Sequence, residues 1–394
     1  MFGKKPYFLP ACLVLSSLLA MPPAVLADPV TELDFRYRVE FVDQDGVDKE
    51  ALASTARLQL GLRSAEWQGF DAGVMFHGNR VIGERRYNDT VAPEPRPVVA
   101  DPADTGISQA WVRYRQGDEL EARLGRQRLI DDNARFLGNV GFRQLEQTFD
   151  ALHVNWRPSD DWDLSLTHLD RAHRIFGTNH PNRLMAEAEL DSWLAVVNRH
   201  WGDTRLGFYA HRFKFEDRPA SHENLGIRLN GPLPGTDAGF HYRLEYARQD
   251  GIGDAGPQET QDYWRLELEQ RLDGWRWFLG HERLGGDGEQ AFQTPFATLH
   301  AHNGWADQFL TTPDVGLQDT WLGIGGQAGD WRLLARWHDF RADATSIDLG
   351  SELNLLAARP LTGPWQTEIK LAWHNGGDNR PDVSKLWWTL SAGF

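Results

Sequence analysis

Apolar and polar residues alternate one by one along most of the chain after residue 30. In LDFRYRVEF (33–41) the odd-numbered positions are apolar and the even-numbered positions are charged. The same alternation recurs in ARLQLGL (56–62), FHYRLEY (240–246), WRLELEQ (264–270) and WQTEIKLAWH (365–374). A period of two residues is that of a β-strand with one apolar and one polar face. The pattern predicts an all-β protein with almost no helix.

The candidate strands are long. Most have about 10 residues, the length that a tilted strand needs to cross a bilayer, whereas strands of soluble proteins usually have about 5–6. They favour a transmembrane antiparallel barrel of about 18 strands, with about 16 as the alternative. The predicted starts lie near residues 33, 52, 68, 106, 119, 147, 161, 186, 203, 222, 237, 260, 274, 317, 330, 346, 363 and 383.

Short and long connections alternate between these strands. Short ones include QGD, WGD and DG, and the long ones are residues 78–105, 130–146, 171–185, 248–259 and 285–316. This is the pattern of short periplasmic turns and long extracellular loops in outer-membrane barrels. Tryptophans beside the short turns predict an aromatic girdle at one membrane interface. They are Trp67, Trp162, Trp201, Trp275, Trp331 and Trp365.

A soluble β-propeller is the alternative for a repeating Trp-containing hairpin pattern. A propeller blade has about 40–45 residues divided among four short strands. Here a similar length of chain holds two long strands, so the pattern favours the barrel.

Residues 1–27 have the pattern of a secretory signal. Lys4 and Lys5 precede an apolar run, and small residues follow up to Ala27. We expect cleavage there, which leaves residues 28–394 as the barrel. A buried N-terminal helix is the alternative. The only cysteine, Cys12, lies inside this segment.

The last strand, SKLWWTLSAGF (384–394), has apolar residues at every second position back from Phe394. It resembles the C-terminal signal that bacterial outer-membrane barrels present to their assembly machinery. The resemblance implies that Phe394 is a recognition element, that the assembly machinery is a partner, and that the protein resides in the bacterial outer membrane. An edge strand of a soluble sheet is the alternative.

Composition limits the possible partners. The formal net charge is −15, which argues against nucleic acid as a ligand. Beyond the N-terminal segment no apolar run approaches the roughly 20 residues of a membrane-spanning helix. No motif calls for a cofactor, and we expect none.

Two internal stretches resemble a known family. RLGRQRLIDDNARFLGNVGFRQLEQTFDALHVNW (123–156) and AFQTPFATLHAHNGWADQFLTTPDVGLQDTWLGIG (291–325) are similar to segments of the alginate export family of outer-membrane proteins. The later GSELNLLA (350–357) resembles a strand of that family. The resemblance implies a passive porin-like channel for an anionic saccharide, with an alginate-like polyuronate as a candidate cargo, and we expect a monomer.

The polar face of the predicted strands is rich in arginine, whose planar guanidinium binds carboxylates in a bidentate manner. A ladder of such sites could pass a polyuronate in weak steps. The alternative is cross-strand pairing with glutamates, which would favour a general or small-solute porin. The predicted pore-lining cations are Arg36, Arg38, Arg57, Arg113, Arg123, Arg205, Arg228, Arg243, Arg265, Arg276, Arg332, Arg336, Lys370 and Lys385.

Two short sequence features could suggest an enzyme or a metal site. His300 and His302 could suggest a metal site, but hydrogen bonding within a folded loop is the better interpretation. Asp131 and Asp132 could suggest a glycosidase, although adjacent loop acids are usually solvated. We therefore predict a channel without catalytic or metal-binding residues, in which at least one of loops 130–146 and 285–316 folds inward and narrows the lumen.

Overall fold

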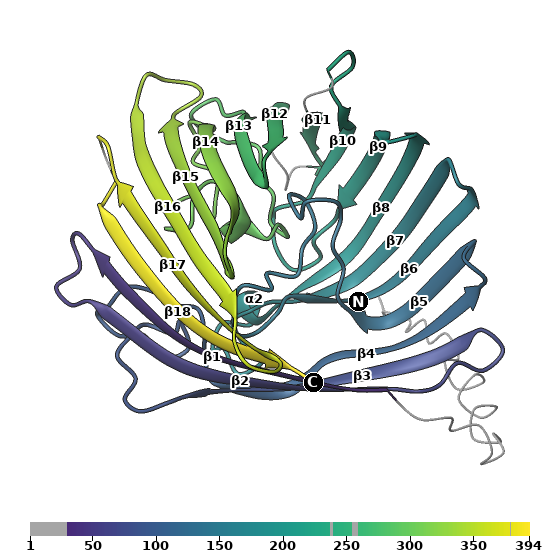
Figure 1. Ribbon diagram of the computed structural model, residues 1–394, viewed down its shortest axis with the longest axis horizontal. Coiled ribbons are helices and arrows are strands. Elements are labelled where there is room, and N and C mark those ends of the chain that lie inside the picture. Colours follow the sequence, from purple (N-terminus) through teal and green to yellow (C-terminus); the bar gives the residue numbers. More distant parts are fainter. Residues whose placement is uncertain (1–29, 237–238, 254–258, 379) are drawn as a thin grey trace, which may run out of the picture.

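The strands close into one antiparallel barrel. The computed structural model describes residues 30–236, 239–253, 259–378 and 380–394, so the predicted signal segment lies outside the described residues. Each strand pairs with its neighbours in sequence, and β1 pairs with β18 to close an 18-stranded sheet (Figure 1). The barrel prediction is confirmed, with 18 rather than 16 strands.

Strand starts fall close to the positions predicted from the sequence. The strands vary from 8 residues in β5 to 15 in β1 and β8. Short helical segments lie in two of the loops, α2 (Arg183–Ala186) and η2 (Leu299–Ala301). The strands are β1 (Val30–Gln44), β2 (Ala51–Arg63), β3 (Phe70–Val81), β4 (Asp104–Gln116), β5 (Leu120–Gln127), β6 (Thr148–Ser159), β7 (Trp162–His173), β8 (Glu187–Trp201), β9 (Thr204–Phe213), β10 (His222–Pro232), β11 (Phe240–Gly251), β12 (Gln261–Leu272), β13 (Trp275–Leu284), β14 (Leu317–Ala328), β15 (Trp331–Arg341), β16 (Asp348–Pro360), β17 (Trp365–Asn375) and β18 (Val383–Gly393).

The apolar face of the strands lies outside the barrel. Leu225 is 70% exposed and Leu124 is 63% exposed, whereas the lumen-facing Arg38 and Glu40 are buried. Such an apolar outer surface suits contact with lipid, because a bilayer offers no water to polar groups. In the described part of the chain, no helix has the length and apolar character needed to cross a membrane.

The short turns use residues that suit hairpins. Between β12 and β13, Asp273 and Gly274 have φ values of 51° and 79°. Positive φ at both central residues matches a type I′ turn, whose twist follows that of the strands. Trp67 and Trp201 lie exposed near such turns, as the girdle prediction requires.

Apolar side chains interrupt the polar lumen face near the long loops of β6 to β9. Toward the long loops, inward positions become apolar, as at Phe149, Leu169, Leu194 and Phe213, and these side chains pack on loop residues such as Phe296. The polar inner face predicted from the alternation is therefore interrupted at these positions, while residues such as Glu282 and Lys385 keep it polar near other long loops. The sequence signal was present, because these inward positions break the polar series along their strands.

Phe394 helps to close the β1–β18 seam. Its backbone N–H donates to Leu33 O at 2.8 Å, and Leu33 N–H donates to Phe394 O at 3.0 Å. The ring is 63% exposed and meets Trp365 edge-on at a centroid distance of 6.4 Å. Its role as an assembly signal stays a prediction.

We expect that deleting Phe394 slows barrel assembly, because both seam hydrogen bonds and the ring contact are lost. The measurement is the heat-modifiable fraction of the protein on a gel during folding into lipid vesicles, and in cells with the assembly machinery. Phe394→Tyr keeps the aromatic ring and should assemble as the wild type does. Equal assembly of the truncated chain would contradict the assembly role.

Candidate functional site

Two long connections fold into the lumen. Loop 1 (residues 128–147) joins β5 to β6, and loop 2 (residues 285–316) joins β13 to β14. Segments of the chain run through the interior of the ring of strands in Figure 1. Loop 1 reaches as far as β1 and β2, where Arg36 Nη1 donates to Gly141 O at 3.1 Å and Gln144 Nε2 donates to Thr55 Oγ1 at 2.9 Å. The predicted inward folding is confirmed for both loops.

The two loops interlock through their backbones. Gly138 N–H donates to Phe296 O at 2.8 Å, and Thr298 N–H donates to Ala134 O at 2.9 Å. A Cβ on Gly138 would lie 2.2 Å from Thr298 Oγ1, so the close approach requires glycine there. Phe142 of loop 1 also stacks on His300 of loop 2 at 3.6 Å. The loops therefore act as one layer across the barrel.

The first anchor of this layer is an ion cluster at Asp131 and Asp132. Arg228 Nη2 donates to Asp131 Oδ2 at 2.6 Å, and Asp132 is bound by both Arg205 and Arg243. Glu245 completes the cluster by accepting from Arg228 Nε at 2.7 Å. The expectation that these two acids are solvated is wrong, because arginines on β9, β10 and β11 hold them against the wall.

The arginines keep both carboxylates charged. Burial alone would raise the pKa of Asp132, but the charges of Arg243, Arg228 and Arg205 outweigh it and hold the pKa well below its usual value. Burial would also raise the pKa of Asp131, but the charge of Arg228 lowers it below its usual value. Neither group holds a proton near neutral pH, so this pair does not supply the general acid of a glycosidase.

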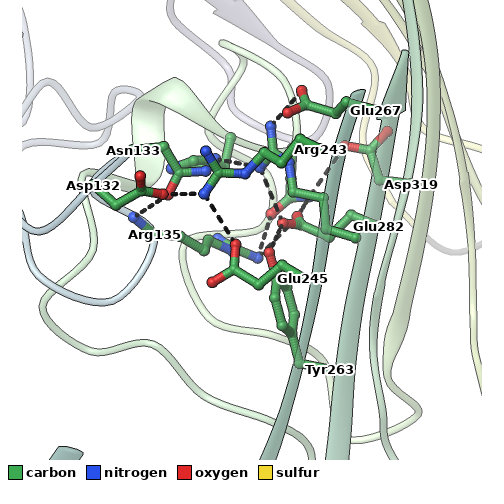
Figure 2. Close-up of polar contacts among 12 residues, drawn as sticks. Asp132, Asn133, Arg135, Arg243, Glu245, Tyr263, Glu267, Glu282 and Asp319 are labelled. Atoms are coloured by element: carbon green, nitrogen blue, oxygen red, sulfur yellow. Dashed lines mark hydrogen bonds and ion pairs between the residues drawn. The ribbon is translucent and has the colours of Figure 1, made fainter. Parts of the chain in front are cut away.

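The second anchor lies next to the first and is drawn with it in Figure 2. Arg135 of loop 1 ion-pairs with Glu282 of β13 at 3.1 Å and donates to Asn303 Oδ1 of loop 2 at 3.1 Å. The amide of Asn303 donates to Glu282 at 2.9 Å and to Asp319 of β14 at 3.0 Å. The Glu282 carboxylate on the wall thus binds both loops.

The third anchor is centred on Asp307 of loop 2. Asp307 pairs with Arg143 of loop 1 at 3.0 Å and with Lys385 of β18 at 2.9 Å. His300 Nδ1 donates to its other oxygen at 2.8 Å, while His300 Nε2 lies 2.7 Å from Lys370 Nζ. Burial, reinforced by Lys370, holds the pKa of His300 well below its usual value, so the ring is neutral and Nε2 accepts from the lysine.

His300 and His302 make hydrogen bonds to side chains of loop 2 and of the wall. Both nitrogens of His300 have partners, and His302 Nδ1 lies 3.3 Å from Arg265 Nη1. Among the residues that the structure describes, no group of His, Cys, Asp and Glu side chains is arranged to hold a metal ion. Hydrogen bonding within a folded loop, the preferred interpretation of the sequence, accounts for His300, whereas His302 bonds to Arg265 of β12 and its Nε2 has no partner among the described residues.

A fourth anchor holds the turn of loop 2. Glu352 of β16 accepts hydrogen bonds from the backbone N–H groups of Trp305 and Ala306, the latter at 2.9 Å. Gly304 has φ of 84°, and a Cβ there would lie 2.3 Å from Glu352 Oε2. Glycine therefore lets the backbone approach the carboxylate.

The structure places every predicted pore-lining cation on the lumen face, but most are engaged. Arg36 and Arg38 donate to backbone carbonyls of loop 1, and Lys370 contacts His300. Within the described chain Arg336 has no ion pair, and it faces the Phe278 ring at 5.2 Å. The cations paired with carboxylates are Arg57, Arg113, Arg123, Arg205, Arg228, Arg243, Arg265, Arg276, Arg332 and Lys385.

The anchoring was not predicted from the sequence. The sequence predicted the face on which each arginine lies and allowed for pairing between adjacent strands, as found for Arg276 and Glu269. The loop partners, such as Phe142 for Arg36, lie far away in the chain. The loop acids themselves were the available signal, because a charged pair beside apolar residues, as in LIDDNARF (129–136), needs cations if it is buried.

We expect loop 1 to detach when Asp132 is neutralised. Removing one partner of a buried ion pair costs about 3–5 kcal/mol, because the other charges stay buried without it. A carboxylate with a lowered pKa stabilises the folded loop above its ordinary pKa of about 4, and this contribution disappears as the pH falls further. Wild-type single-channel conductance should therefore begin to rise as the pH falls below about 4, and should reach its full increase only below the lowered pKa of Asp132.

Asp132→Asn should show the raised conductance already at neutral pH, with little further change in acid. Asp118→Asn, in an exposed short turn, is the matched control and should behave as the wild type. An Asp132→Asn channel with wild-type conductance at both neutral and acidic pH would contradict the anchoring role.

Known structures share this architecture. The chain is similar to OpdO of Pseudomonas aeruginosa, with 14% identity, a TM-score of 0.72, and coverage of 94% of this chain and 98% of that chain. OccAB2 of Acinetobacter baumannii has 15% identity and a TM-score of 0.71, covering 92% and 98%. OpdK of P. aeruginosa, solved with vanillate, has 14% identity and a TM-score of 0.71, covering 94% and 100%.

These likenesses concern the fold. No curated protein sequence matches the chain. The sequence profile described as alginate export matches residues 30–285, which is more than half of the chain and includes loop 1 with its Asp131–Asp132 pair. The barrel, the inward loops and this match lead to one conclusion: the protein belongs to the alginate export family and is a channel of the bacterial outer membrane.

Proposed function

We propose that this channel passes anionic saccharides by passive diffusion, with an alginate-like polyuronate as the cargo class, and that it works as a monomer. The family membership supports an anionic polymer as cargo. The observation that carries the proposal is a cluster of three lumen-facing arginines, Arg36, Arg38 and Arg57, on β1 and β2.

Arg36 and Arg57 lie directly opposite each other across the β1–β2 ladder, and Arg38 follows on the same face. Like charges at opposite positions destabilise a sheet. Asp34 pairs with Arg57, whereas Arg36 and Arg38 bind only uncharged acceptors within the described chain. Together with Arg336, this leaves a positive excess on the wall, which suits carboxylates.

A small-solute porin is the second candidate. The observation that favours it is the interlocking of loops 1 and 2, held to the wall at several anchors, since a layer of this kind leaves a narrower path than an open barrel. A surface enzyme receives no support from the candidate acids, which are held by arginines.

We expect reconstituted channels to prefer anions, and Arg336→Gln to shift the reversal potential toward cations. Arg336 is the informative position because its substitution breaks no ion pair. The preference should weaken with salt, since the Debye length falls from about 10 Å at 0.1 M to about 3 Å at 1 M. A polyuronate should block the current more than a neutral glucan of equal length.

Arg248→Gln is the control, because Arg248 is exposed on the outer face and pairs with Asp250. It should leave the selectivity unchanged. Cation selectivity of the wild type, or equal block by both polymers, would remove the anionic cargo and favour the small-solute porin.

A separate prediction concerns the constriction. Deleting residues 286–314 removes loop 2 and the partners of Glu282, Glu352 and Lys385. Single-channel conductance should rise several-fold, with heat-modifiable migration preserved because the strand ladder is intact. Unchanged conductance in a folded deletion variant would show that ions follow a path that loop 2 does not narrow.

A further inference from the structure

A recess lies between loop 1 and the wall formed by β5 to β9. Its volume is about 340 Å³, and loop 1 residues 129–132 and Leu137 form one side of it. On the wall it extends down to Glu121, Asp163 and Arg205, each the second residue of its strand at the short-turn end. The recess therefore opens toward the periplasmic half of the lumen and ends beneath loop 1.

The middle of this wall carries uncharged polar side chains, whereas the carboxylates Glu121 and Asp163 at its short-turn end accept hydrogen bonds from Arg123 and Asn198. Asn155 on β6 and Ser165 on β7 lie opposite each other in the ladder, and His153 and Thr167 lie opposite each other in the next row toward loop 1. Asn155 Nδ2 donates to His153 Nε2 at 3.0 Å, so the Nδ1–H of His153 donates to Thr167 Oγ1 at 2.7 Å. This chain fixes the orientation of the Asn155 amide and directs its carbonyl oxygen away from His153.

Two groups on this wall have no partner in the described protein. Neither Asn155 Oδ1 nor Ser165 Oγ makes a hydrogen bond, and both residues are half-buried and line the recess. They offer one acceptor and one hydroxyl that both donates and accepts. Adjacent groups of this kind match the vicinal hydroxyls of a sugar ring.

Arginines stand at both edges of the wall. Arg123 on β5 binds Glu121, and Arg205 on β9 binds Asp132, in each case through Nη2 alone. Their side chains are 23% and 27% exposed, so each guanidinium keeps donors that face the recess. The Trp111 ring, 4.8 Å from the Arg123 guanidinium carbon, supports the first of them. A carboxylate is the ligand group that such donors bind best.

We propose that this recess is a binding subsite for a single hexuronate unit, whose hydroxyls bind Asn155 and Ser165 and whose carboxylate binds an edge arginine. The volume lies at the lower end of the roughly 300–1,000 Å³ of ligand sites, which suits one sugar ring. The inference rests on the proposed function and specifies it. The subsite is reached first from the periplasmic side, because loop 1 separates it from the extracellular side.

The test uses the full-length channel in a planar bilayer, with sodium glucuronate as the probe and glucose as the neutral comparison. Glucuronate added on the short-turn side should reduce the current in a saturable way, at lower concentration than from the opposite side and lower than glucose requires. The double variant Asn155→Ala/Ser165→Ala should weaken the apparent affinity about tenfold, because two hydrogen bonds are lost.

Arg123→Gln should remove most of the preference for glucuronate over glucose. Gln366→Ala is the matched control, since Gln366 is an exposed, lumen-facing amide on β17 outside the recess. If the double variant fails to fold, Ser165→Ala alone supplies the test with an expected loss of several-fold.

Unchanged glucuronate affinity in the recess variants, or equal affinity for glucuronate and glucose in the wild type, would overturn the subsite. These results are distinct from failure of the proposed function. If polyuronate blocks the channel but the recess variants do not change the block by glucuronate, the anionic cargo stands and the subsite is excluded. If the channel is cation-selective and polyuronate does not block it, both the anionic cargo and the subsite are excluded.

Discussion

A buried charge needs a partner, and this constraint organises the interior of the barrel. An unpaired charge away from water costs several kcal/mol, so arginines on the wall and carboxylates on the loops are stable only together. Asp131, Asp132 and Asp307 bring the negative charge inward on loops, and β9, β10, β11 and β18 supply the cations. Loop 1 and loop 2 are thereby fixed across the lumen without a covalent link.

The same constraint divides the barrel into two halves. Near the long loops, apolar inward residues such as Phe149 and Leu194 pack on the loops and exclude water. Near the short turns, the wall keeps polar atoms such as Asn155 Oδ1 and Ser165 Oγ, which make no hydrogen bond among the described residues. A solute from the periplasmic side would therefore meet these polar atoms before it reaches the loop layer.

The arginines of the lumen serve two purposes that share one physical basis. Guanidinium binds a loop carbonyl or carboxylate by the same directed hydrogen bonds that would bind a uronate. Arg36 shows the overlap, because its Nη1 holds the carbonyls of Gly141 and Phe142 while the residue remains half-exposed in the lumen. Under the proposed function, a cargo carboxylate would compete with loop 1 for the same donors.

The amino-acid sequence alone determined the barrel, its strand boundaries and the face of each lumen arginine, because a two-residue period and turn residues such as Asp273–Gly274 act locally. Only the tertiary structure decided which charges remain free. The partner of Arg228 is Asp131, and the partner of Lys385 is Asp307, both distant in the chain. Loops of this length carry no periodicity, so their path depends on pairing and packing energies that arise only after the barrel has closed.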